Sequence, residues 1–131
     1  MGVPSPAIHV NPSTRVIDIP GKGRGVVAIR KIARGELIET APVVVVPAVQ
    51  VQGVLEHYVF DWPYLSDKVA VALGCGSLYN HSYAPNAVYL KHLEERVLEY
   101  TALRDIEAGE EILINYNGAP DDMTPLWFTV V

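Results

Sequence analysis

Cysteine is nearly absent from this chain, since Cys75 is the only one among 131 residues. A single cysteine excludes a disulfide within the chain and a zinc site built from several thiolates. It predicts a protein of a reducing compartment, cytoplasmic or, in a eukaryote, nuclear. We expect Cys75 to behave as a small buried apolar side chain.

Long apolar runs are also lacking. The longest one covers residues 41–49, which is too short to span a bilayer and contains Pro42 and Pro47. No basic segment followed by an apolar stretch stands near the first residues, so a secretory signal is not expected. The sequence therefore predicts no membrane partner.

Positive charge is scarce, because 10 Lys and Arg face 15 Asp and Glu for a net charge of −5 at pH 7. A nucleic-acid binder needs a basic face to neutralise phosphates, so direct binding to DNA or RNA is not expected. An acidic surface suits a basic protein or peptide partner, and it serves solubility equally well.

The composition that remains, 50% hydrophobic and 19% charged, is typical of one globular domain with a mainly β fold. Short β-branched runs are separated by glycine-containing turns. We expect strands at residues 15–19, 25–30, 36–46, 68–73, 87–91 and 96–103. Apolar residues recur at helical intervals within residues 52–60, ahead of Pro63, which predicts a small helical insert.

Residues 28–38 repeat within the chain, because they align without gaps to residues 102–112, with identical Ala, Arg, Ile, Gly, Glu and Ile at matching positions. Two copies are too few for a solenoid. We expect two similar strand-turn-strand corners related by an approximate twofold axis, each with a glycine at a positive φ. The alternative is that Ile-x-x-Gly-Glu is simply a good turn sequence.

Two polar segments stand out. Residues 79–86 read Tyr-Asn-His-Ser-Tyr-Ala-Pro-Asn, a cluster whose side chains can fix turns and hydrogen-bond a ligand. Residues 109–116, Gly-Glu-Glu-Ile-Leu-Ile-Asn-Tyr, lead from a glycine turn through an apolar strand to a tyrosine hydroxyl. Upstream, residues 23–28 read Gly-Arg-Gly-Val-Val-Ala. Taken singly, each has an ordinary structural interpretation; together they indicate one site.

In this order and spacing, the three segments resemble the signatures of SET-domain protein-lysine methyltransferases, over about Arg15 to Tyr116. The resemblance implies a mainly β SET-domain β-clip of short strands and hairpins, with a small helical insert and a threaded C-terminal segment. The domain division expected from it is a flexible arm at 1–13, a SET domain at 14–118 and a C-terminal tail at 119–131 that covers the active site.

The resemblance also implies an activity, the S-adenosylmethionine-dependent methylation of a lysine side chain in a basic protein or peptide, with no metal. It implies Tyr116 as the catalytic residue. The implied cofactor contacts are Gly23, Arg24, Gly25, Asn80 and His81, and the implied walls of the lysine channel are Tyr79, Tyr89 and Ile114. A homodimer is one way to supplement so small a domain. The alternative is a SET-like β-clip binding module without turnover.

The sequence departs from the family pattern at several points. Tyr83 stands where many members have Cys, and Asn115 replaces the usual Asp before the tyrosine. No cysteine-rich segment supplies the zinc-bound tail that covers the site in many relatives. We expect Trp127 and Phe128 to wall the cofactor or the channel instead, the alternative being a surface tail or a dimer contact. Ile114 occupies a place that often limits the degree of methylation, so the sequence leaves that degree open.

Overall fold

The computed structural model describes residues 9–10, 13–63 and 67–126, and strands dominate it, as predicted. In chain order the elements are β1 (His9–Val10), β2 (Thr14–Ile19), β3 (Gly23–Ala28), β4 (Leu37–Pro47), η1 (Ala48–Gln50), η2 (Gly53–Tyr58), β5 (Val59–Asp61), β6 (Lys68–Ala72), β7 (Asn80–His81), β8 (Ala87–His92), β9 (Val97–Ala102) and β10 (Leu113–Ile114). Within this described part, no helix is long and apolar enough to cross a membrane.

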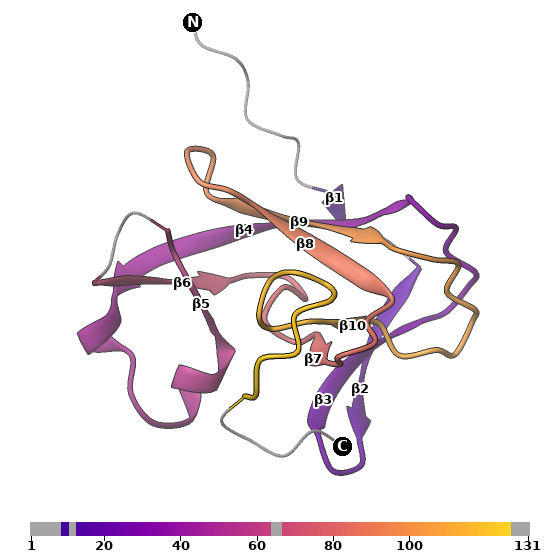
Figure 1. Ribbon diagram of the computed structural model, residues 1–131, viewed down its shortest axis with the longest axis horizontal. Coiled ribbons are helices and arrows are strands. Elements are labelled where there is room, and N and C mark those ends of the chain that lie inside the picture. Colours follow the sequence, from indigo (N-terminus) through magenta and orange to yellow (C-terminus); the bar gives the residue numbers. More distant parts are fainter. Residues whose placement is uncertain (1–8, 11–12, 64–66, 127–131) are drawn as a thin grey trace, which may run out of the picture.

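The largest sheet is built on the long strand β4, which crosses much of the molecule (Figure 1). Its strand order is β5-β6-β4-β9-β8, and β1 also pairs with β4. Residues 37–42 of β4 pair with β9, whereas residues 43–47 pair with β6. The predicted hairpin is confirmed as β8 paired with β9. Since β4 changes partner along its length, strands from both halves of the chain share one sheet.

The core lies under this sheet and under the separate β2-β3 hairpin. In β4, residues 38–41 are all buried, so both faces of this part of the strand are covered. Further along, Val43 is buried and Val44 is 48% exposed, as expected of alternating side chains. Strand-forming β-branched and aromatic residues supply much of the remaining core. Its largest fully buried apolar side chains are Tyr79, Tyr100, Ile32, Ile38, Leu98, Ile106, Ile112, Ile114 and Val26.

The internal repeat forms two corners that face each other, which confirms the predicted twofold relation. Ile32 donates to the Ile106 carbonyl at 2.8 Å, and Ile106 donates back to Ile32 at 2.8 Å. Gly35 donates to the last carbonyl of β9 at 2.8 Å, and Gly109 to the last carbonyl of β3 at 2.7 Å. Both glycines have positive φ, at 82° and 89°. We call these segments, residues 28–38 and 102–112, the twin corners.

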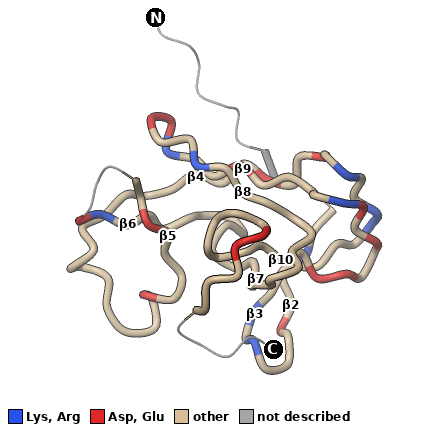
Figure 2. Tube along the Cα trace, in the orientation of Figure 1, with Lys and Arg blue, Asp and Glu red and all other residues tan. Residues whose placement is uncertain are grey.

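Each twin corner carries the same ion pair. The Nη2 of Arg30 lies 2.7 Å from Glu36 Oε2, and the Nη2 of Arg104 lies 3.2 Å from Glu110 Oε2. Each carboxylate also accepts a backbone N–H from its own turn, at 3.1 and 3.0 Å. Figure 2 accordingly shows acidic and basic residues interspersed at this end of the molecule.

The small helical insert predicted within residues 52–60 is present, but the prediction is wrong at its C-terminal end. Residues 53–58 form a 3-10 helix, η2, none of whose residues is buried, and Val54 is 73% exposed. Residues 59–61 form β5, because Val59 and Phe60 find antiparallel partners on β6. Within the expected arm, β1 is an edge strand on β4 and Ser13 is buried.

Candidate active site

The two polar signatures lie side by side although more than one strand separates them in sequence. β7 pairs in parallel with β10, with Asn80 opposite Leu113 and His81 opposite Ile114. Ser82 extends the contact by donating to the Ile114 carbonyl at 2.9 Å. The predicted apolar strand is only two residues long here, so Tyr116 lies in the turn that follows it.

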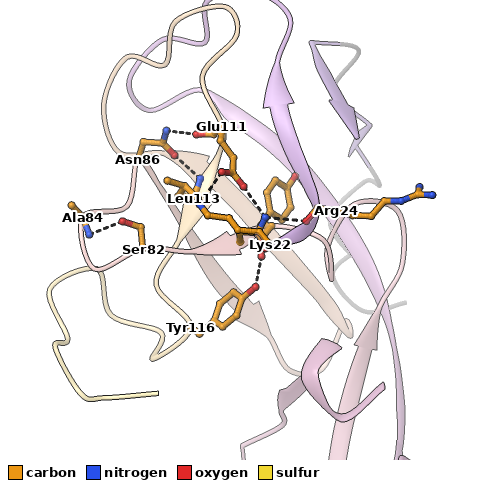
Figure 3. Close-up of polar contacts among 10 residues, drawn as sticks. Lys22, Arg24, Ser82, Ala84, Asn86, Glu111, Leu113 and Tyr116 are labelled. Carbon is orange, nitrogen blue, oxygen red and sulfur yellow. Dashed lines mark hydrogen bonds and ion pairs between the residues drawn. The ribbon is translucent and has the colours of Figure 1, made fainter. Parts of the chain in front are cut away.

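Asn86 fastens the two signatures together. Its Nδ2 donates to the Glu111 carbonyl at 2.8 Å, and its Oδ1 accepts the Leu113 N–H at 2.8 Å (Figure 3). Its side chain is 1% exposed, so both groups would be left unsatisfied without these bonds. Asn86 therefore fixes the position of β10 relative to the loop that follows β7.

His81 holds the backbone of Tyr116. The Tyr116 N–H donates to His81 Nδ1 at 3.0 Å, which requires that nitrogen to be unprotonated. Burial lowers the pKa of His81, so the ring is neutral near pH 7 and can accept this bond. The predicted contact residue His81 is thus placed behind Tyr116 as its support.

The Tyr116 hydroxyl is also fixed, because it donates to the Tyr79 carbonyl at 2.7 Å (Figure 3). Burial, followed by the charges of Tyr58, Glu111 and Tyr89, raises the pKa of Tyr116 far above its usual value. The phenol therefore keeps its proton at neutral pH. With that proton directed at a carbonyl, the lone pairs of the oxygen are left to face a ligand.

A cavity of about 290 Å³ opens beside Tyr116. It is lined by residues of η2, β5, β8 and the loops before β7 and after β10. They are Glu56, His57, Tyr58, Val59, Phe60, Asp61, Gly76, Ser77, Tyr79, Tyr89, Lys91, Tyr116, Asn117 and Gly118. Three of the predicted site residues, Tyr79, Tyr89 and Tyr116, therefore meet at one cavity.

The predicted channel residues differ in how they meet it. Tyr89 donates to the Tyr116 carbonyl at 3.4 Å, and burial raises the pKa of Tyr89 to about 12. Tyr79 is 1% exposed and donates its hydroxyl to Glu39 at 2.6 Å, so its phenol is used for structure. Ile114 is fully buried in the core and is not among the residues that line the cavity.

Two of the predicted cofactor contacts, Asn80 and Gly25, lie against Glu111, and the Arg24 carbonyl joins them through Asn80. Asn80 Nδ2 donates to Glu111 Oε2 at 2.7 Å and to the Arg24 carbonyl at 2.9 Å. Lys22 Nζ lies 3.0 Å from Glu111 Oε1. A Cβ on Gly25 would lie 2.8 Å from Asn80 Nδ2, so only glycine fits under this cluster. Gly23 differs, since a Cβ there meets nothing within 4 Å.

Several of these residues were missed by the sequence reasoning. Lys22 and Glu111 complete the cluster at Asn80. The available signal was their place in the sequence, since Glu111 lies within the signature at residues 109–116 and Lys22 directly precedes residues 23–28. Glu56, Asp61 and Lys91 add charge to the cavity wall, and no pattern in the sequence marked them. Trp127 and Phe128 lie outside the described residues. In the described residues no group of three His, Cys, Asp or Glu could hold a metal ion.

The structure explains why residue 115 is Asn rather than Asp. Its Nδ2 donates to the Asp122 carbonyl at 2.7 Å and to the Pro120 carbonyl at 3.4 Å. Its Oδ1 accepts the Asn117 N–H at 3.0 Å. A carboxylate accepts only and would face two carbonyl oxygens, so the Asp of the family pattern does not suit this loop.

Comparisons with known proteins agree with this geometry. A family model described as the SET domain matches residues 23–117. A Schizosaccharomyces pombe protein named histone-lysine N-methyltransferase, H3 lysine-37 specific, is 33% identical over an alignment of 116 residues that covers 85% of this chain and 74% of that protein. A crystal structure from Plasmodium falciparum, whose protein is provisionally titled a histone methyltransferase, gives a TM-score of 0.69 at 28% identity, covering 82% of this chain and 95% of that one.

Proposed function

The chain belongs to the SET domain family of protein-lysine methyltransferases, and we propose that the methyl donor binds at Asn80 while the acceptor lysine enters the cavity at Tyr116. The observation that carries this assignment is the position of Tyr116. Its backbone rests on the β7 signature, and its ring lines the cavity. No observation favours the alternative of a binding module without turnover.

The cluster at Glu111 suits the amino-acid part of S-adenosylmethionine, which carries an ammonium and a carboxylate. Glu111 offers a carboxylate, and the Lys22 ammonium has three protons, of which Glu111 accepts one. The space next to Gly23 lets backbone approach a ligand closely. When bound, S-adenosylmethionine supplies an electrophilic methyl group on a positively charged sulfur.

The cavity suits a lysine side chain. Glu56 and Asp61 attract its ammonium, since opposite charges favour approach. Deeper in, the Tyr89 and Tyr116 rings replace water, and desolvation lowers the pKa of a lysine amine. The amine can therefore lose its proton to solvent before it meets the methyl group.

Tyr116 acts by position, because its phenol keeps its proton and cannot serve as a base at neutral pH. With its hydrogen held by the Tyr79 carbonyl, its oxygen can contact the polarised C–H groups of the methyl. Such alignment lowers the barrier by several kcal/mol. A displacement of about 1 Å is expected to reduce the rate on the order of 10²-fold.

The substrate we propose is a basic protein tail of the histone type. The acidic residues of the cavity and the name of the Schizosaccharomyces pombe relative support this class. In a eukaryotic host, a histone substrate implies action in the nucleus. A homodimer remains part of the proposal, because exposed Val49, Val54 and Leu55 give η1 and η2 an apolar surface.

Calorimetric titration with S-adenosylmethionine tests the donor site. We expect saturable binding in the wild type. Binding to Asn80→Ala should be at least about tenfold weaker, because this variant loses a hydrogen bond to a charged group, which costs about 1.5 to 3 kcal/mol. The matched control is Gln50→Ala, an exposed amide outside the cavity and the cluster. Equal affinity in both variants would remove Asn80 from the donor site.

Methyl transfer to an array of histone-tail peptides tests the acceptor site. We expect label on lysine-containing peptides and none on matched peptides with arginine in place of lysine. Donor binding without transfer to any lysine would contradict the proposed substrate class.

A further inference from the structure

The cavity wall itself contains a lysine. Lys91 lies two residues after Tyr89 on β8, so both side chains leave the same face of the strand, with Cα atoms roughly 7 Å apart. Both line the cavity that contains Tyr116. The chain's other lysines, Lys22, Lys31 and Lys68, do not line it.

The Lys91 side chain is held in place by a single described hydrogen bond. Its Nζ donates to the Asp61 carbonyl on β5 at 2.7 Å. The other charged or titratable groups of the cavity are Glu56, His57, Tyr58, the Asp61 carboxylate, Tyr79, Tyr89 and Tyr116. A four-carbon stem gives the amine freedom to leave the carbonyl and move along the cavity.

We propose that the chain methylates its own Lys91, in cis, an inference that rests on the proposed function. The neutral Nζ uses its lone pair to form the N–C bond, and the bond between the methyl carbon and the sulfonium sulfur breaks with its electron pair going to sulfur. The methylammonium product releases a proton to water. S-adenosylmethionine is the co-reactant, and no oxidant or reductant is needed.

The environment of Lys91 supports this chemistry. Burial lowers the pKa of Lys91, opposed by the weaker effect of the Asp61 carboxylate, so the neutral amine is more accessible than on an exposed lysine. Accessibility from solvent favours a different lysine, because the side chain of Lys31 is 58% exposed. Methylation of Lys91 in preference to the more exposed Lys31 would thus show that the amine reaches the methyl donor through the cavity.

The test uses the full chain with S-adenosylmethionine whose methyl group is isotopically labelled, and no peptide substrate. Digestion after acidic residues, which methylation of lysine does not alter, precedes mass spectrometry. We expect label at Lys91, and a labelled fraction per hour that stays constant over a hundredfold dilution of the chain. Lys31→Arg should retain that label, and Lys91→Arg should lose it.

Three results would overturn the inference. They are label at Lys22, Lys31 or Lys68 ahead of Lys91, a rate per chain that rises in proportion to its concentration, and no label on a chain that methylates peptides. The last leaves the proposed function intact. A chain that binds the donor and labels neither itself nor any peptide would instead contradict the proposed function.

Discussion

At the scale of single residues, Tyr116 is held from three sides. His81 binds its N–H, Tyr89 approaches its carbonyl, and the Tyr79 carbonyl accepts its hydroxyl proton. A tyrosine fixed in this way can align a small group without moving during the reaction, which suits a step governed by positioning.

Removing the hydroxyl should therefore harm turnover more than binding. In Tyr116→Phe we expect kcat to fall on the order of 10²-fold, with the donor affinity changed little. The control is Tyr83→Phe. Tyr83 donates its hydroxyl to the Thr124 carbonyl at 3.1 Å and does not line the cavity. Equal kcat in the two variants would show that Tyr116 has no special role.

Asn115 positions Tyr116 from the following loop. In Asn115→Asp the lost donors and the added charge should lower the free energy of unfolding by about 1 to 3 kcal/mol. Misplacement of Tyr116 should also reduce kcat. Denaturant unfolding and kinetics check both effects, with Asp121→Asn, an exposed position in the same loop, as control. A fully active, equally stable Asn115→Asp protein would rule out this role.

At the scale of elements, the likeness of the twin corners predicts that the same glycine substitution lowers the free energy of unfolding equally in each. A Cβ on Gly35 or Gly109 meets nothing within 4 Å, so Gly→Ala at either position costs only the strain of a positive φ. We expect about 1 to 2 kcal/mol for each, measured as the shift in the free energy of unfolding. A large difference between the two would mean that the corners are not energetically equivalent.

The contact between β7 and the turn after β10 should depend on pH. The pKa of His81 is lower in the folded chain than its usual 6.5, so the unfolded chain binds more protons between the two values. This contribution to stability is complete above pH 6.5 and is lost as the pH falls toward the folded pKa. Urea midpoints at several pH values should fall more steeply on acidification for the wild type than for His81→Asn.

Short patterns predicted the strands well, because β-branched runs ended at glycine turns that the structure retains. The repeat predicted the twin corners. The signatures predicted that residues 79–86 and 109–116 share one site, and the structure adds that the two segments pair as β7 and β10. The insert was less predictable, since apolar spacing cannot reveal whether η2 finds a surface to pack on. Nor could Lys91 or Asp61 be assigned to the cavity, because only the curl of the sheet brings β8 and β5 together.

At the scale of the whole molecule, the two end strands of the β5-β6-β4-β9-β8 path meet across the cavity. Phe60 of β5 packs edge-on against Tyr89 of β8, with 5.3 Å between ring centroids at 70°. Lys91 adds its hydrogen bond to the Asp61 carbonyl. The cavity is therefore closed by side chains rather than by a backbone ladder.

Weakening this side-chain contact should weaken binding of the peptide more than binding of the methyl donor. Phe60→Leu keeps an apolar side chain and loses the ring contact, worth about 0.5 to 1.5 kcal/mol. We expect KM for a lysine peptide to rise severalfold while calorimetric affinity for S-adenosylmethionine stays constant. Val54→Leu, on exposed η2, serves as the control. A change in donor affinity alone would refute the assignment of this wall to the peptide.

The parallel pairing of β7 with β10 has a consequence for biosynthesis. A ribosome releases Asn80 and His81 well before Leu113 and Ile114, so β7 has to wait for its partner strand while β8, β9 and one twin corner are being made. Contacts so distant along the polypeptide slow folding, because loop-closure entropy is lost before they form. The proposed active site around Tyr116 therefore assembles late in synthesis, once β10 and Tyr116 have left the ribosome and reached β7 and His81.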